Sequence, residues 1–160
     1  MQRWLEFPNP VNDKAARSVA ALVLIAALAV LATHAWWLLP VMAAGFALRV
    51  AFGPRVSPAA LLATRVIAPR LGAPVPTPGP PKRFAQAIGL AVTGGATLAA
   101  FAFDSHTTAL ALTALIAVAA GLEAILGICI GCRAFAVLMR IGLIPRRVCM
   151  QCARGEAFVS

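Results

Sequence analysis

The sequence predicts an all-α membrane protein with four transmembrane helices arranged as two hairpins. The chain has 160 residues, of which 61% are hydrophobic and only 12% are charged, whereas soluble domains carry about 25% charged residues. Its apolar residues are gathered into long runs, each close to the ~20 residues that an α-helix needs to cross a bilayer. Its basic residues, 14 Lys and Arg against 5 Asp and Glu, bracket these runs. We therefore expect most of the folded surface to face lipid.

Residues 1–17 form a polar N-terminal segment, and the first helix is expected to begin near its end. Asn12 has the side chain of an N-cap, and Asp13 would place an acid in the first helical turn. Residues 18–53 then hold two apolar runs that are separated only by a short stretch at His34. Because one helix of their combined length would far exceed the ~20 residues of a single span, we expect a hairpin of two spans that turns at His34.

A connector over residues 54–83 joins the two halves of the chain. Ser57 followed by Pro58 is typical of a helix start, and apolar residues follow at helical spacing. This helix is too short and too charged to span a bilayer, so we expect it to lie along the membrane surface. Residues 73–81 contain five prolines, which predicts a stiff, extended linker.

Residues 84–128 repeat the hairpin pattern, with a turn at Asp104-Ser105-His106. Small residues recur every four positions in both apolar runs, and such stripes let two helices approach closely in lipid. We expect the two stripes to contact each other. They consist of Ala85, Gly89, Thr93 and Thr97 in the first run, and of Ala109, Thr113, Ala117 and Gly121 in the second.

The distribution of charge predicts how the chain is oriented. Neither short turn contains Lys or Arg, and all 14 of these residues flank the runs or lie in the segments between and beyond the hairpins. The positive-inside rule then places both termini and the connector in the cytoplasm, as in a multi-pass protein of the plasma (bacterial inner) membrane. Basic residues at the ends of apolar runs fit anionic lipid headgroups. A nucleic-acid interface would present them on a polar surface, so we expect membrane lipid as a partner and no nucleic acid.

The C-terminal segment, residues 129–160, contains the four cysteines of the chain as two C-x-x-C pairs. The first pair is Cys129 and Cys132, the second is Cys149 and Cys152, and 16 residues lie between them. This spacing falls inside the window of a four-thiolate zinc site, and each pair alone matches a redox dithiol. An apolar helix over residues 134–144 followed by Pro145 would let the second pair fold back onto the first.

Three hypotheses for the role of the cysteines remain open from the sequence. In the leading hypothesis, the protein is a thiol-disulfide redox or sulfur-transfer component, with Cys129 and Cys132 as the primary pair and Cys149 and Cys152 as the resolving pair. In the second, all four thiolates hold a structural zinc ion on a membrane scaffold or docking protein. In the third, the cysteines have no chemical role. Nearby Arg133, Arg146 and Arg147 favour thiolates, which both a redox pair and a metal site require. Small-molecule transport ranks lowest among the functions because the spans offer little polar lining.

Glu123 is the acid inside the last apolar run. It lies six residues before Cys129, which is about 9 Å deeper along a helix. An acid at that depth is costly unless it is paired, and by default it is a functional candidate. Arg49, near the end of the second span, is the basic residue at comparable depth. We expect Glu123 and Arg49 to form an intramembrane polar pair.

Two motifs resemble a known family. With F-P-N-P-V-N at residues 7–12 and C-I-G-C at residues 129–132, the chain resembles a family of small bacterial membrane proteins, common in actinobacteria, that is described only as a domain of unknown function. The resemblance covers most of the chain and implies a four-helix membrane protein with a cysteine-bearing cytoplasmic end. Family members are often encoded near thioredoxin-like and rhodanese-like proteins. The resemblance therefore implies thiol or sulfur chemistry with such a partner, but it assigns no catalytic residue.

Overall fold

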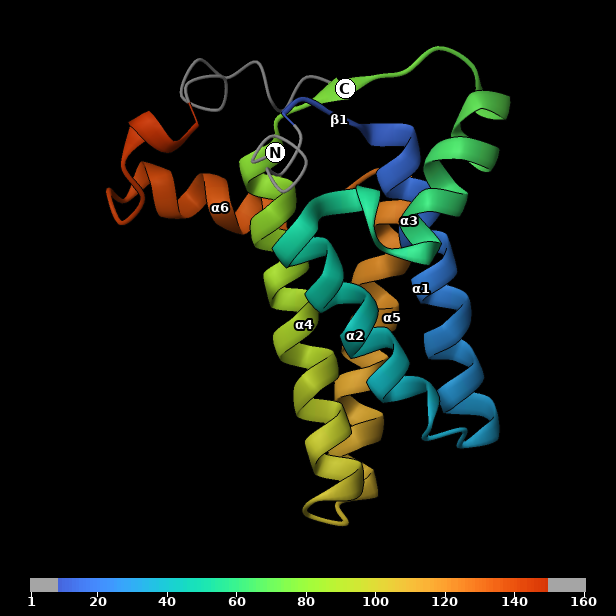
Figure 1. Ribbon diagram of the computed structural model, residues 1–160. Coiled ribbons are helices and arrows are strands. Elements are labelled where there is room, and N and C mark those ends of the chain that lie inside the picture. The colour runs from blue at the N-terminus through green and yellow to red at the C-terminus, as the bar shows by residue number, and fades with distance from the viewer. Residues whose placement is uncertain (1–8, 150–160) are drawn as a thin grey trace.

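The computed structural model describes residues 9–149, which form a helical bundle with one small pair of strands (Figure 1). The six α-helices are α1 (Asp13–Thr33), α2 (Leu38–Phe52), α3 (Pro58–Leu62), α4 (Gly79–Phe101), α5 (His106–Leu126) and α6 (Ile130–Arg140). The strands β1 (Val11–Asn12) and β2 (Pro76–Thr77) are antiparallel. Short 3-10 turns cover Gly53–Arg55, Ala68–Leu71 and Arg146–Val148, and a π-helical turn covers Ala63–Ile67. The all-α prediction is confirmed.

Three of these helices are long and apolar enough to cross a membrane. They are α1, α4 and α5, with 21, 23 and 21 residues. Helix α2 is apolar but has only 15 residues, so it is about 22 Å long, shorter than the ~30 Å hydrocarbon core of a bilayer. It begins only at Leu38, because residues 36–37 belong to the turn. It ends at Phe52, and its C-cap Gly53 has φ 71°. Many large apolar side chains of α1, α4 and α5 point outward, as expected of a lipid-facing surface: Ile25, Leu28, Ile88, Leu98, Leu115, Val118 and Ile125.

The two expected hairpin turns are present. His34 adopts the left-handed conformation with φ 55° and ends α1, and Asp104 has φ 50° in the turn between α4 and α5. These turns lie at one end of the bundle, while the strands, α3 and α6 lie at the other (Figure 1). All segments that carry the candidate site are therefore at the same end.

The helices pair across the two hairpins more than within the first one. Helix α1 packs along α5, and α2 packs along α4, whereas α1 and α2 contact each other little. The expected contact between the two small-residue stripes is therefore only partial. A Cβ on Gly89 of α4 would collide with the ring of Phe46 on α2, and one on Gly121 of α5 would meet Leu24 on α1. The small residues at these positions leave room for larger side chains of other helices, Phe46 of α2 and Leu24 of α1.

The connector helix begins where the sequence indicates, but it does not remain α-helical. Ser57 is the N-cap of α3 and Pro58 its first residue, and the chain then continues as a π turn and a 3-10 turn up to Gly72. Its buried face consists of alanines, Ala60 and Ala63, which join the main core under α1 and α2. Its larger residues Leu62 and Val66 are exposed. This leaves an apolar face free for the membrane surface.

Candidate functional site

The first cysteine pair lies at the start of α6, just after the chain leaves α5. Gly127 ends α5 in the left-handed conformation, with φ 70°, and Cys129 is the N-cap of α6. The backbone N–H of Cys132 donates a hydrogen bond to Cys129 Sγ over 3.4 Å. Both side chains are free thiols of intermediate exposure. A sulfur thus takes the place that a Ser or Asp oxygen usually holds at a helix N-terminus.

The surroundings make the two thiols unequal. A hydrogen bond from the Cys132 side chain lowers the pKa of Cys129, and the Lys82 ammonium group lowers it further, against the opposing effects of burial and of Glu123. The same hydrogen bond and burial raise the pKa of Cys132. Cys129 is therefore the more acidic thiol of the pair, and Cys132 the less acidic one. A cysteine at a helix N-terminus beside a cation is typical of reactive thiols.

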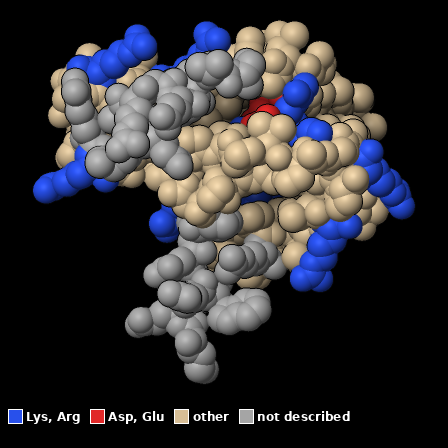
Figure 2. Space-filling model, turned by 90° about the horizontal axis from the view of Figure 1, so that it is seen from above, with Lys and Arg blue, Asp and Glu red and all other residues tan. Residues whose placement is uncertain are grey.

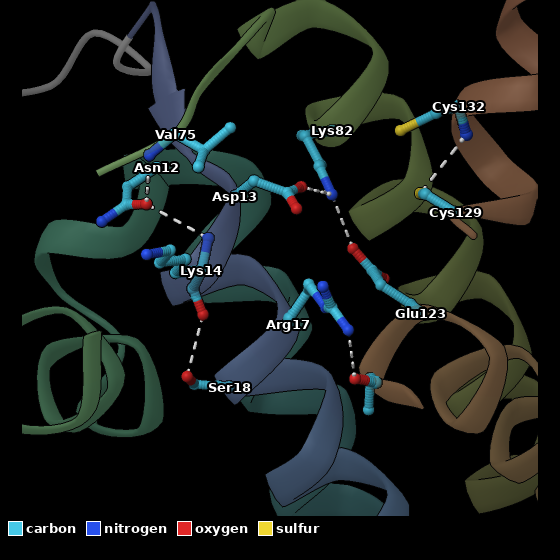
Figure 3. A network of polar contacts seen from close by, with 11 residues as sticks. Asn12, Asp13, Lys14, Arg17, Ser18, Val75, Lys82, Glu123, Cys129 and Cys132 are labelled. Carbon is cyan, nitrogen blue, oxygen red and sulfur yellow. Dashed lines mark hydrogen bonds and ion pairs between the residues drawn. The ribbon is translucent and has the colours of Figure 1, made fainter. Parts of the chain in front are cut away.

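Lys82 is the centre of the charged cluster beside this pair (Figure 3). Its Nζ lies 2.8 Å from Glu123 Oε1 and 3.0 Å from Asp13 Oδ1, and only 5% of its side chain is exposed. One ammonium group thus joins the start of α1, the start of α4 and the last turn of α5. Such a buried cation requires partners, since an unpaired charge in a low-dielectric site is strongly unfavourable.

The expected pair of Glu123 with Arg49 is replaced by this arrangement. Arg49 is buried, but its Nε donates to Gln86 Oε1 over 2.8 Å and its guanidinium group lies over the Phe46 ring, 4.4 Å from the centroid. The reason is the pairing of helices. Helix α2 packs along α4 and directs Arg49 to Gln86, whereas the first turn of α4 brings Lys82 to Glu123.

The segment around Asn12 positions Asp13 and Lys82. Asn12 Oδ1 accepts hydrogen bonds from the N–H groups of Lys14 and Val75, so it caps α1 and holds the proline-rich linker. The Asn12 cap is thereby confirmed. Asn9 Oδ1 accepts from the N–H of Gly79 at the start of α4. The Asn9-to-Asn12 part of the F-P-N-P-V-N motif therefore ties the first turns of α1 and α4 together, and Phe7 and Pro8 lie outside the described residues.

Gly131 of the C-I-G-C motif allows α6 to cross α4. A Cβ at this position would lie 2.5 Å from the Cβ of Ala85 and 2.6 Å from its Cα, which no real side chain tolerates without a shift of the backbone. Ala85 is one turn after Lys82. The absence of a side chain at Gly131 thus brings the start of α6, and with it both thiols, to the level of Lys82.

Arg17 closes the end of α5 next to this crossing. Its Nη2 donates to the carbonyl oxygens of Ala124 and Ile125, over 3.2 and 3.0 Å. These carbonyls belong to the last turn of the helix, where they have no partner within the helix. The cation from α1 therefore stabilises the end of α5 and the turn that leads to Cys129.

The second cysteine pair is described only in part. Cys149 returns to α6, where it is 5% exposed and packs with Phe135 and Met139, one and two turns beyond Cys132. It is disulfide-bonded, and Cys152 lies outside the described residues. Within residues 9–149, no three His, Cys, Asp or Glu side chains are gathered to hold a metal ion. Among the described residues, Cys149 does not join Cys129 and Cys132 in such a group, and the four-thiolate zinc site stays a prediction.

Sequence reasoning found both cysteines and Glu123 but missed Lys82, Asp13 as its partner, and Gly131. In the sequence, Lys82 and Arg83 form a basic flank of an apolar run. In the structure only Arg83 of the two is exposed, and its Nε donates to the Val50 carbonyl. The available signal for Lys82 was Glu123, a buried acid that required a cation. The sequence prediction pairs Glu123 with Arg49 instead.

Comparison with known proteins identifies the family of the chain. A family model described as "Domain of unknown function (DUF4395)" matches residues 11–140. The chain belongs to the DUF4395 family. The matched range covers most of this DUF4395 protein and contains the cluster of Asp13, Lys82, Glu123, Cys129 and Cys132, and it ends before Cys149. The resemblance that the two motifs indicated is confirmed. No curated protein and no solved structure matches the chain.

Proposed function

We propose that this DUF4395 protein is an inner-membrane component of thiol-disulfide redox or sulfur-transfer chemistry, with Cys129 and Cys132 as its reactive pair. The observation that supports this function best is the inequality of the two thiols. Cys129, at the N-terminus of α6, is favoured as a thiolate, and Cys132, hydrogen-bonded to it, is favoured as a thiol. A nucleophile with a protonated neighbour is what exchange through a mixed disulfide requires.

The exchange then runs in two steps. The Cys129 thiolate attacks one sulfur of a partner disulfide, forms a mixed disulfide and releases the other partner sulfur as a thiolate. The Cys132 thiol loses its proton and attacks Cys129 Sγ, which forms the Cys129–Cys132 disulfide and releases the reduced partner. Two electrons pass to the partner, and the reverse sequence returns them. A sulfur-transfer reaction would use the same nucleophile on the outer sulfur of a partner persulfide.

The partner that fits this site is a cytoplasmic thioredoxin-like or rhodanese-like protein. Such proteins present a reactive cysteine at an exposed position, so they can reach a pair at the membrane surface. The cytoplasm keeps thiols reduced, so a free Cys129–Cys132 pair is the resting form expected there.

Substitution of Cys132 is expected to trap the partner. In Cys132→Ser the mixed disulfide on Cys129 has lost the thiol hydrogen-bonded to it, so a covalent complex should accumulate in cells and disappear on treatment with dithiothreitol. Non-reducing electrophoresis followed by mass spectrometry measures it. Cys129→Ser is the matched control and should trap nothing, because the sulfur that attacks the partner disulfide is gone. A stoichiometric zinc ion held by all four sulfurs, with metal content and thermal stability falling in Cys149→Ser and no complex trapped, would replace redox exchange by the zinc scaffold.

We further propose four spans with both termini and the connector in the cytoplasm. The support is charge: Lys and Arg side chains surround the end of the bundle that carries the site, and acids show only in a small patch between them (Figure 2). Helix α2 is short for a span, but flanking residues can extend it. Residues Trp36 and Trp37 suit one interface, and Arg49 lies near the other end of the helix. A short span is accommodated by local thinning of the bilayer at modest cost.

Reporter fusions test this topology. Fusions at Gly79 and at the C-terminus are expected to report the cytoplasm, and a fusion at Ser105 the opposite side, because every basic segment is then inside. Alkaline phosphatase and green fluorescent protein activities measure the two locations. A fusion at Gly79 that reports the periplasm, with the C-terminal fusion unchanged, would mean that α2 does not span and that three helices do.

A further inference from the structure

A cavity of about 290 Å³ begins at the cysteine pair and extends into the bundle. Residues of α1, α2, α4 and α5 and the start of α6 line it. Its lining includes Cys129 and Glu123 at one end and reaches Leu115 of α5, eight residues before Glu123. Eight residues of helix correspond to about 12 Å. The cavity therefore starts at the site and extends along α5 for about this length.

The cavity opens sideways between α4 and α5. Most of its lining is buried or half-buried, but Ile88 of α4 is 39% exposed, Leu115 of α5 is 55% exposed and Ile130 of α6 is 46% exposed. Helix α6 projects away from the bundle at the end that carries the site (Figure 1). Both α4 and α5 are long and apolar enough to span a membrane, so the opening faces lipid. A ligand that enters here comes from the bilayer.

The chemistry of the lining is apolar with a polar end. Apart from Gln86, Glu123 and Cys129, its residues are aliphatic, Phe46 or glycine. The Gln86 side chain is held by Arg49 and the Glu123 carboxylate by Lys82. Pockets of this kind, apolar with a few fixed polar groups, are typical ligand sites. A cavity of about 150 Å³ is large enough for benzene, so this space suits a ring of one or two cycles with an apolar tail leading out to lipid.

We propose that this cavity binds the ring of a membrane quinone, and that the quinone is the electron acceptor of the Cys129–Cys132 pair. The proposal rests on the proposed thiol function and names its oxidant. A phospholipid acyl chain would also fit an apolar space, but it has no use for a thiolate and a carboxylate in the lining. A quinone uses the thiolate, because its reduction takes two electrons from sulfur.

The step balances as a two-electron, two-proton transfer. The Cys129 thiolate attacks the quinone ring and forms a carbon–sulfur bond, and the ring carries the negative charge on its oxygen. Cys132 passes its proton to the ring oxygens and its thiolate attacks Cys129 Sγ. This forms the disulfide and breaks the carbon–sulfur bond, whose electron pair stays on the ring. The second proton comes from the cytoplasmic solvent, and the quinol leaves to the lipid. A cytoplasmic dithiol then reduces the Cys129–Cys132 disulfide by exchange.

A short-chain quinone tests the proposal on the full-length protein in lipid nanodiscs. The reduced protein, under anaerobic conditions, is mixed with ubiquinone-1 or menadione, and quinol absorbance and free thiols are followed. We expect one quinol per Cys129–Cys132 disulfide. In the Cys129→Ser/Cys132→Ser double variant we expect quinone binding, measured by photolabelling with an azidoquinone, without reduction.

Substitutions at the opening separate this proposal from the thiol function. Leu115→Trp, or Ile88→Trp as a second variant, should fill the opening and slow quinone reduction at least tenfold, while exchange with a small disulfide such as oxidised glutathione stays unchanged. Val118→Trp is the matched control, since Val118 is 61% exposed on the same helix and does not line the cavity. Unchanged quinone reduction in both opening variants would overturn the proposal. So would wild-type protein that exchanges thiols normally but neither binds nor reduces quinone, or that retains a phospholipid which quinone does not displace.

Discussion

Lys82→Met is expected to destabilise the protein by about 3 kcal/mol, the low end of the cost of removing one partner from a buried ion pair. The low end applies because Asp13 keeps 24% of its side chain exposed, so solvent screens part of its charge. Without the ammonium group, the carboxylates of Asp13 and Glu123 face each other with no cation between them. The free energy of unfolding, from denaturation in mixed micelles, measures the effect.

Arg83→Met is the matched control for this substitution. Arg83 is the next residue along α4, and its Nε donates to one exposed carbonyl group, so we expect a change below about 1 kcal/mol. Glu123→Gln should cost less than Lys82→Met, because Lys82 then keeps Asp13 as its partner. Equal costs for Lys82→Met and Arg83→Met would show that the cluster contributes nothing to stability.

The same variant has a readout at the cysteines. The Lys82 ammonium group lowers the pKa of Cys129, so its removal raises that pKa and the thiolate forms only at higher pH. The rate of Cys129 alkylation by iodoacetamide, followed by peptide mass spectrometry, should rise with pH along a curve displaced to higher pH in Lys82→Met. In Arg83→Met the curve should coincide with that of the wild type.

Local rules explain which parts of the fold were predictable. The cap at Asn12, the turn at His34 and the helix start at Pro58 each depend on a few adjacent residues, and all three lie where the sequence indicates. The pairing of helices does not depend on adjacent residues. Depth along a helix can be counted from the sequence, and it is this count that predicts a pair of Glu123 with Arg49. The direction in which each side chain points depends on the neighbouring helix. For this reason Lys82, and not Arg49, is the partner of Glu123.

The cysteine site likewise combines features set by adjacent residues with features set by the packing of distant helices. The C-x-x-C spacing places Cys129 at the helix cap and Cys132 three residues later, where its backbone N–H donates to Cys129 Sγ. This arrangement depends only on local geometry. The cation that acts on both thiols comes from a helix start 47 positions earlier in the chain. The cavity is formed by five elements, and its lining carries no motif. Neither feature follows from spacing alone.

Gly131→Ala is expected to displace α6 and to separate the thiols from Lys82. The added Cβ would lie 2.6 Å from the Cα of Ala85, and because that atom belongs to the backbone of α4, the clash is relieved only if one helix moves. Overpacking of this kind costs about 1 to 3 kcal/mol. We also expect the alkylation curve of Cys129 to move to higher pH, as in Lys82→Met, although every charge of the cluster is still present.

Two variants make this result specific to the crossing of α4 and α6. Gly94→Ala is the matched control, because a Cβ on Gly94 of α4 meets nothing within 4 Å, and alanine favours the helix by up to about 1 kcal/mol. In the double variant Gly131→Ala/Ala85→Gly, the Cβ of Ala85 is gone but its Cα remains, so rescue should be partial. Stability and the alkylation curve should then fall between those of Gly131→Ala and the wild type. If Gly131→Ala were as stable and as reactive as the wild type, α6 would not cross α4 at this glycine, and the effect of Lys82 on Cys129 would need another path.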